Sequence, residues 1–192
     1  MTGLEHVLDR PDRLEEIAAH HVLEPDLRAR LSEISLETAV LLGVPVGLVT
    51  VLVPGAQLFV GSHGVQGWLA EAGGTPVEWS FCAQVVSRRA AYVVQDATED
   101  ALHRDSPLVT RFGVRTYAGV PVTVGAGHVI GAHCVTGAVP RWYSRSDLRC
   151  LEAGAVRVVE ALAQHRAGWD PADRLARGRA RPQHPRSVSG CT

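Results

Sequence analysis

The spacing of hydrophobic positions changes several times along the chain, and each change predicts a new element. In three ranges the apolar residues recur at helical steps of three and four, which predicts helices over 11–23, 26–43 and 145–165. Four runs rich in β-branched residues are predicted as strands, over 46–53, 57–65, 115–124 and 128–136. Long helices that flank paired strands place the chain in the α+β class.

Turn residues join these strands into two hairpins. Pro54-Gly55 separates the first two runs, and Gly125-Ala126-Gly127 separates the last two. Between the hairpins the pattern is weaker. It predicts an irregular loop over 67–79 and a short helix over 81–89. A brief strand over 92–95 and a loop with one helical turn over 100–113 are expected to follow.

Polar residues and glycine mark the expected ends of the helices. Asp26 is predicted to cap the second helix and Gly43 to end it. Ser80 is placed to cap the short helix. Ser144, followed three residues later by Asp147, resembles a capping box for the last helix.

The order of elements between Trp79 and Trp142 resembles the GAF domain, a bacterial ligand-sensing and dimerising module. The resemblance rests on the pieces SFCAQVV, VVQDAT, RTYAGVPVTV and HVIGAHCVT, taken in that order. It implies a central antiparallel sheet with the first and last long helices on one face, and short helices and loops that enclose a pocket on the other. The expected organisation is an N-terminal helical extension, a GAF domain, and a disordered Arg- and Pro-rich tail, over 1–25, 26–166 and 167–192.

Composition and charge exclude several classes of partner. The net charge is −1, which gives no general attraction to nucleic acid or to an anionic membrane. All nineteen basic residues are arginine, so Schiff-base chemistry at a lysine is excluded. No charged residue occurs from Thr38 to Ala70, but glycines and prolines interrupt this run and argue against a membrane span. No secretory pattern opens the chain, so we expect a cytoplasmic protein.

The four cysteines, Cys82, Cys134, Cys150 and Cys191, form no CxxC pair, which argues against a structural zinc site. In the cytoplasm their thiols are expected to be reduced. Cys82 follows the predicted helix cap, where the helix dipole lowers a thiol pKa, although a small buried hydrophobe is the commoner role of free cysteine. The sequence leaves open a disulfide or redox couple between Cys82 and Cys134.

His133 and Cys134 are neighbours on a predicted strand, so their side chains point to opposite faces and cannot bind one metal ion. Cys134 shares its face with Ile130, Ala132 and Thr136, a small and apolar set that is predicted to pack against the helices. His133 is therefore the predicted pocket residue. The alternative is a histidine that is hydrogen-bonded for structural reasons alone.

The candidate pocket residues combine aromatic side chains with a few polar ones, as is usual for small-molecule sites. Aromatic core packing is the alternative for each aromatic residue. For Asp96, the alternative to binding a ligand is to cap a turn. For Arg115, the alternatives are to bind an anionic ligand or to form an ion pair with Asp96. The complete set of ligand-binding candidates is Trp79, Phe81, Cys82, Asp96, Phe112, Arg115, Tyr117 and His133.

The resemblance also implies specialised branches, whose marks are missing here. The segment LHRDSPLVTRFGVRTY has no cysteine for a covalent bilin, and neither the NKFDE-type residues of cyclic-nucleotide binders nor the cysteine-bearing glycine loop of free methionine sulfoxide reductases is found. We therefore expect a non-enzymatic sensory or regulatory protein, without catalytic residues, metal or cofactor, and with an unidentified small ligand or none. The alternative is a redox-, haem- or metal-dependent sensor or enzyme that uses Cys82 and His133.

The two long helices carry apolar residues on more than one face, so each is expected to contact both the sheet and a second subunit. The resemblance implies a homodimer through 26–43 and 145–165. It also implies an actinobacterial-type protein whose output lies in other signalling proteins, such as kinase-like or small-GTPase components. The predicted dimer contacts are Leu27, Leu31, Ile34, Leu148, Leu151, Ala155, Val158 and Leu162.

Overall fold

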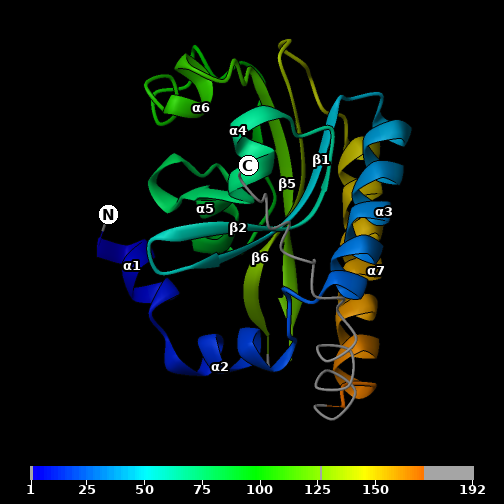
Figure 1. The fold of residues 1–192 in the computed structure, drawn as a ribbon. Coiled ribbons are helices and arrows are strands. Elements are labelled where there is room, and N and C mark those ends of the chain that lie inside the picture. The colour runs from blue at the N-terminus through cyan, green and yellow to red at the C-terminus, as the bar shows by residue number, and fades with distance from the viewer. Residues whose placement is uncertain (1, 126, 171–192) are drawn as a thin grey trace, which may run out of the picture.

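The computed structural model describes residues 2–125 and 127–170. At its centre is a six-stranded sheet, formed by β1 Val46–Val53, β2 Ala56–His63, β3 Gly74–Pro76, β4 Tyr92–Val94, β5 Thr116–Val124 and β6 His128–Gly137. The order of the strands is β3-β2-β1-β6-β5-β4, and every neighbouring pair is antiparallel (Figure 1). Both predicted hairpins, β1–β2 and β5–β6, are confirmed, and they meet through β1 and β6.

Helices cover both faces of this sheet. They are α1 Thr2–Leu8, α2 Pro11–Ala19, α3 Pro25–Leu42, α4 Gly67–Ala72, α5 Cys82–Arg88, α6 Pro107–Thr110 and α7 Arg145–Ala167, with a 3-10 turn η1 at Val77–Trp79. α3 and α7 lie side by side on one face, α1, α4, α5 and α6 lie on the other side, and α2 lies near one end of the sheet (Figure 1). This is the predicted α+β architecture.

The space between the sheet and the pair α3–α7 is filled by an apolar core. Leu31 of α3, Val51 of β1, Ile130 of β6 and Val158 of α7 are buried together there. On the outer surface, Arg157 and Glu37 form an ion pair that joins the two helices. The space between the sheet and the two helices is therefore filled by side chains.

The predicted dimer residues are mostly used inside the chain, which corrects the prediction from the sequence. Seven of them are no more than 7% exposed, namely Leu27, Leu31, Ile34, Leu151, Ala155, Val158 and Leu162. Leu148 is half-buried. Their periodicity is explained by contact with the sheet of the same chain. The apolar side chains of α3 and α7 that point outward are instead Leu36, Val40, Leu41 and Val156.

Three of the four predicted helix ends are confirmed. Gly43 ends α3 in the left-handed region, and Ser144 with Asp147 forms the capping box of α7. The Ser80 hydroxyl accepts a hydrogen bond from the Ala83 amide at 3.2 Å. The prediction for Asp26 is wrong: α3 begins at Pro25, which suits the first helical position, so Asp26 already lies in the first turn.

The elements that the pattern did not predict are short. The region 67–79, expected to be irregular, contains α4 and the edge strand β3, which pairs with β2. α1 was not predicted, and α2 ends at Ala19 rather than at residue 23. In each case fewer than ten residues are involved, and such segments are stabilised by contacts with the rest of the fold rather than by their own pattern.

Arg13 connects α2 to the end of the sheet by hydrogen bonds. Its guanidinium is buried and donates hydrogen bonds to the backbone carbonyls of Val129 at 2.9 Å, Leu52 at 2.7 Å and Ile130 at 2.8 Å. Burial lowers the pKa of Arg13 to about 10, so the side chain remains charged at neutral pH. One side chain thus joins the N-terminal helices to both central strands.

Within the described part of the chain, no helix is long and apolar enough to cross a membrane. The uncharged run from Thr38 to Ala70 forms instead the end of α3, the β1–β2 hairpin and the start of α4. Of the tail predicted to be disordered, residues 171–192 lie outside the described residues. Trp169, near its start, stacks on His21 with ring centroids 3.8 Å apart.

Candidate ligand-binding cavity

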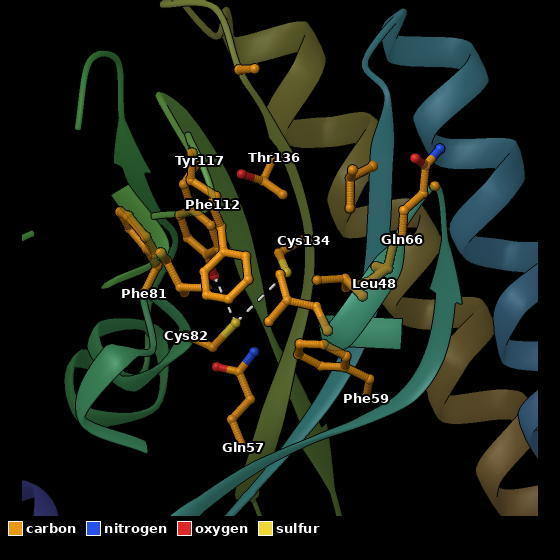
Figure 2. Close-up of a pocket in the computed structure, with 17 residues that line it drawn as sticks. Leu48, Gln57, Phe59, Gln66, Phe81, Cys82, Phe112, Tyr117, Cys134 and Thr136 are labelled. Atoms are coloured by element: carbon orange, nitrogen blue, oxygen red, sulfur yellow. Dashed lines mark hydrogen bonds between the residues drawn. The ribbon is translucent and has the colours of Figure 1, made fainter. Parts of the chain in front are cut away.

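A cavity of about 430 Å³ lies on the face of the sheet opposite α3 and α7. Its floor is formed by strand residues, including Leu48 of β1, Phe59 of β2 and Cys134 of β6, and α5 contributes Cys82 to its side (Figure 2). It forms here because short elements, rather than one long helix, cover this face. They leave space between their side chains and the sheet.

The wall of the cavity is apolar and uncharged. Four aromatic rings contribute to it, those of Phe59, Phe81, Phe112 and Tyr117. Among the residues that the structure describes, no Asp, Glu, Arg or His side chain lines it. The polar groups in the wall are those of Gln57, Gln66, Thr136 and Tyr117, together with two thiols. Such a wall favours neutral ligands, because a buried charge without a partner is strongly destabilised.

Exposed residues at one end of the cavity provide a route to solvent. Gly64, Gln66, Phe112 and Ala138 all contact both the cavity and the surrounding water. Phe112 is 38% exposed and stacks on Trp68, with the ring centroids 5.9 Å apart. Aromatic rings therefore border the entrance.

Deep in the cavity a tyrosine and two cysteines contact one another. The Tyr117 hydroxyl donates a hydrogen bond to the Cys82 sulfur at 3.2 Å, and the Cys82 and Cys134 sulfurs are 3.7 Å apart (Figure 2). Burial, followed by the nearby thiols, raises the pKa of Tyr117 well above its usual range, which keeps the phenol protonated. The side chain thus remains a hydrogen-bond donor.

Gly119 provides the space that Tyr117 occupies. It lies on β5 directly opposite Cys134. A Cβ atom at Gly119 would lie 2.1 Å from the Tyr117 hydroxyl oxygen and 3.0 Å from the Cys134 Cβ. Any larger residue there would therefore displace the tyrosine from the thiols.

Of the eight predicted ligand-binding residues, the structure places four in the cavity wall: Phe81, Cys82, Phe112 and Tyr117. Trp79 is not part of the wall. Its ring lies behind Phe112, with the centroids 6.5 Å apart, and its carbonyl accepts a hydrogen bond from Ser106. Sequence position alone could not distinguish residues that line the cavity from residues, such as Trp79, that pack next to them.

Asp96 and Arg115 pair with each other and do not line the cavity, which decides between the alternatives left by the sequence. The Arg115 guanidinium donates two hydrogen bonds to the Asp96 carboxylate, one of them at 2.8 Å. That carboxylate also accepts from the Thr98 amide and hydroxyl, as a turn cap does. The bond from Arg115 holds the pKa of Asp96 far below its usual range.

The faces of His133 and Cys134 are the reverse of those predicted. His133 is fully buried on the side of α3 and α7, where Nδ1 donates to the Leu48 carbonyl at 3.2 Å and Nε2 accepts from the Thr38 hydroxyl at 2.9 Å. Cys134 faces the cavity. The predicted alternation holds from Ala132 to Thr136. It breaks at the bulge near Ile130, which packs on the helix side, whereas Val129 packs on the cavity side. His133 is hydrogen-bonded on the helix side by polar partners that are distant in sequence.

Space for the His133 ring is provided by Gly154 of α7. A Cβ atom at Gly154 would lie 2.5 Å from His133 Nε2 and 3.0 Å from the Thr38 hydroxyl oxygen. His133 therefore cannot reach the cavity, and it cannot share a cofactor with Cys82, which lies on the other face of the sheet. In the residues that the structure describes, no three His, Cys, Asp or Glu side chains are grouped to hold a metal ion.

Several wall residues were missed by the sequence analysis. Cys134 and Thr136 were assigned to the wrong face, and Leu48, Phe59 and Gln57 were treated only as parts of a hairpin. The alternation along β6 was the available indication, since either of its faces could have formed the wall.

A six-stranded antiparallel sheet with two long helices on one face and an apolar cavity on the other defines a cavity-bearing α+β domain. The sequence model of the GAF domain family matches residues 26–162, which is more than half of the chain. The chain therefore belongs to the GAF domain family.

Two kinds of relative are informative. In sequence, the chain is 32% identical over 120 residues to a cyclic di-GMP phosphodiesterase of Pseudomonas aeruginosa. The match covers 62% of this chain but only 20% of that protein, so the chain spans about a fifth of its length. In structure, it resembles the GAF domain of a phosphoenolpyruvate-protein phosphotransferase from Coxiella burnetii, with a TM-score of 0.62, 14% identity, and coverage of 86% and 96% of the two chains.

A further structural neighbour is the free methionine-R-sulfoxide reductase of Neisseria meningitidis, with a TM-score of 0.61, 15% identity, and coverage of 80% of this chain and 87% of that one. At such identity the likeness concerns the fold. The expectation of a protein without enzymatic activity is nevertheless contradicted, because proteins named as enzymes are found among the relatives in both sequence and structure.

Proposed function

We propose that this chain is a sensory GAF domain whose cavity binds a small, uncharged molecule with an apolar body. The observation that carries the proposal is a cavity of about 430 Å³ with an aromatic and aliphatic wall and no charged side chain in it. This volume lies within the range of small-molecule sites, about 300–1,000 Å³. Contact with such a wall favours binding by roughly 25 cal/mol for each Å² of apolar surface removed from water.

The polar groups of the wall restrict the ligand further. The Gln57 side-chain oxygen accepts a hydrogen bond from the Ser80 hydroxyl, and Figure 2 shows the amide nitrogen of Gln57 turned toward the cavity. The Tyr117 hydroxyl, by contrast, already donates its proton to Cys82, so the Gln57 amide is the donor that remains for a ligand. A ligand with one carbonyl-type acceptor therefore fits this part of the cavity better than one with only donors.

Cyclic di-GMP does not fit this description, although a relative is named for it. Its two phosphate groups require cationic or strongly hydrogen-bonding partners, usually arginine or lysine. The nearest candidate identified from the sequence, Arg115, is already paired with Asp96. The uncharged wall therefore argues for a different ligand from the substrate in that name.

The proposal is tested by thermal shift with a panel of neutral aromatic and aliphatic carbonyl compounds, with cyclic di-GMP as a charged comparison. We expect stabilisation by members of the neutral set and none by cyclic di-GMP. Ala138→Phe places a ring at the entrance and should abolish the shift, whereas Val139→Phe, at the exposed neighbour outside the wall, should not. Equal behaviour of the two variants, or a response to cyclic di-GMP alone, contradicts the proposal.

We further propose that the protein acts as a homodimer and transmits its state to partner signalling proteins, with kinase-like or small-GTPase components as the partner class. Support comes from the outer surface of the α3–α7 pair, where Leu36 is 40%, Val40 67% and Val156 58% exposed. Exposed apolar side chains on adjacent helices are typical of an interface. The helices also contact the sheet that forms the cavity floor, so a change in the cavity can alter their packing.

A further inference from the structure

The cavity wall contains two thiols that the proposed ligand binding does not use. Cys82 begins α5 and Cys134 lies in β6. Both are free, both side chains are at most 2% exposed, and their sulfur atoms are 3.7 Å apart. Figure 2 shows the two side chains directed toward each other at the cavity, with the Tyr117 hydroxyl beside Cys82.

The surroundings make the two sulfurs chemically unequal. Burial raises the pKa of the Cys82 thiol, but hydrogen bonds from Cys134, Thr50, Tyr117 and Ser80 outweigh burial and bring that pKa to about 7. The hydrogen bond to Cys82, together with burial, raises the pKa of Cys134 well above its ordinary value. Cys82 is therefore the sulfur that ionises, and the Cys134 thiol donates a hydrogen bond to it.

We propose that Cys82 and Cys134 form a two-electron redox site, which an organic hydroperoxide entering the cavity oxidises to a disulfide. The paired geometry provides both sulfurs, and the cavity provides access to them from solvent. The apolar wall favours a hydroperoxide with an apolar body over hydrogen peroxide, which gains little from contact with it. This inference rests on the same cavity as the proposed function but on no particular ligand.

The reaction balances with the hydroperoxide as the only oxidant. The Cys82 thiolate attacks the terminal peroxide oxygen, the O–O bond breaks, and the alkoxide leaves as an alcohol after taking up the proton released by Cys82. Cys82 is now a sulfenic acid. The Cys134 sulfur then attacks the Cys82 sulfur, the S–O bond breaks, and water leaves with the thiol proton. Two thiols and one hydroperoxide thus give one disulfide, one alcohol and one water molecule.

Closing the bond changes the shape of the cavity. The sulfurs have to move from 3.7 Å to about 2.05 Å apart, the length of a disulfide. β6 is held by strands on both sides and by the hydrogen bonds of His133, whereas α5 is a seven-residue helix. α5 is therefore the element that moves, and the cavity becomes smaller in the oxidised protein.

The test uses the full chain, reduced and then treated at pH 7 with cumene hydroperoxide or with hydrogen peroxide. Disulfides are mapped by mass spectrometry of unreduced peptides. We expect a Cys82–Cys134 disulfide as the first product, formed faster with cumene hydroperoxide. Cys82 should react before Cys150, since hydrogen bonds lower the pKa of the Cys82 thiol, whereas burial raises that of Cys150. Oxidation that begins at Cys150 or Cys191 while Cys82 stays reduced would overturn the proposal.

Two variants separate the roles of the sulfurs. In Cys134→Ser the sulfenic acid at Cys82 should persist and react with dimedone. In Cys82→Ser, Cys134 should remain unmodified. Cys150→Ser is the matched control and should behave as the wild type. Thermal melting of each reduced variant identifies any that does not fold, and the mapping of the wild-type disulfide is decisive without them.

The redox proposal and the ligand proposal can be contradicted independently of each other. Ligand binding is measured on the reduced protein and does not require either sulfur to react. A protein that binds a neutral ligand but never forms the Cys82–Cys134 disulfide contradicts the redox site alone. A protein that forms the disulfide but is stabilised by no member of the panel contradicts only the ligand proposed above.

Discussion

At the scale of single residues, His133 connects the cavity floor to both long helices. Its Nδ1 atom binds the carbonyl of Leu48, whose side chain lines the cavity, and its Nε2 atom binds Thr38 of α3. Gly154 of α7 leaves room for the ring. His133 thus contacts the strands of the cavity floor and both long helices at once.

The buried state of His133 makes the stability of the protein dependent on pH. Burial lowers the pKa of His133 from 6.5 to about 4. Below pH 6.5 the unfolded chain therefore takes up a proton that the native protein does not bind, so stability is complete above pH 6.5 and is lost as the pH falls toward 4. The loss is about 3 kcal/mol at pH 4. Burial shifts the pKa of His103 in the same direction and adds to the effect.

The contribution of His133 is measured by urea unfolding between pH 7 and pH 4. His133→Gln should lower stability at pH 7, since it loses a fitted pair of hydrogen bonds, but should flatten the dependence on pH. His128→Gln, at the partly exposed start of the same strand, should keep the wild-type slope. An unchanged slope in His133→Gln would contradict this account.

Residue by residue, the site could be predicted in part. Phe81, Cys82, Phe112 and Tyr117 were placed near a pocket from their position in the order of elements. The side of the sheet on which His133 lies could not be predicted, because alternation defines two faces without saying which one the helices cover. The partners that decide it, Thr38 and Leu48, are 95 and 85 residues away from it in sequence.

At the scale of elements, α2 depends on Arg13 for its position. Removing the guanidinium leaves buried carbonyls at the end of β1 and the start of β6 without this donor. We expect Arg13→Met to destabilise the protein by about 2 to 4 kcal/mol, measured by urea unfolding. Arg10→Met, which loses only an exposed contact with Asp12, should leave the stability nearly unchanged. Similar values for the two variants would show that the buried hydrogen bonds contribute little.

Long elements with a regular pattern were predicted well, and short ones were not. α3, α7 and the four long strands were predicted to within about two residues of their observed ends, which is the usual uncertainty of helix and strand boundaries. α1, α4 and β3 have three to seven residues each. They form where other elements provide contacts: α1 packs on α5, α4 on β3, and β3 pairs with β2. These short elements become ordered only when the tertiary structure forms.

At the scale of the whole molecule, the proposed homodimer gives a prediction that distinguishes inner from outer helix positions. Leu151 is fully buried against the sheet, so Leu151→Glu should unfold the monomer, because an unpaired buried charge costs about 3–5 kcal/mol. Val156, on the outer surface of the same helix, is 58% exposed. Val156→Glu should leave the thermal melt unchanged and yield a monomer by light scattering. A wild-type protein that is monomeric at micromolar concentration would contradict the dimer.

The charge distribution around the cavity has a consequence for the kind of compound that can reach and occupy it. Every Asp, Glu and Arg side chain that the structure describes lies outside the cavity wall, so the compounds that match the wall carry no net charge. Such compounds partition into lipid and cross bilayers without a transporter. The large free-energy cost of moving an ion from water into the bilayer core does not apply to them. Occupancy of the cavity would then follow the concentration of a membrane-permeant compound, with little dependence on ionic strength.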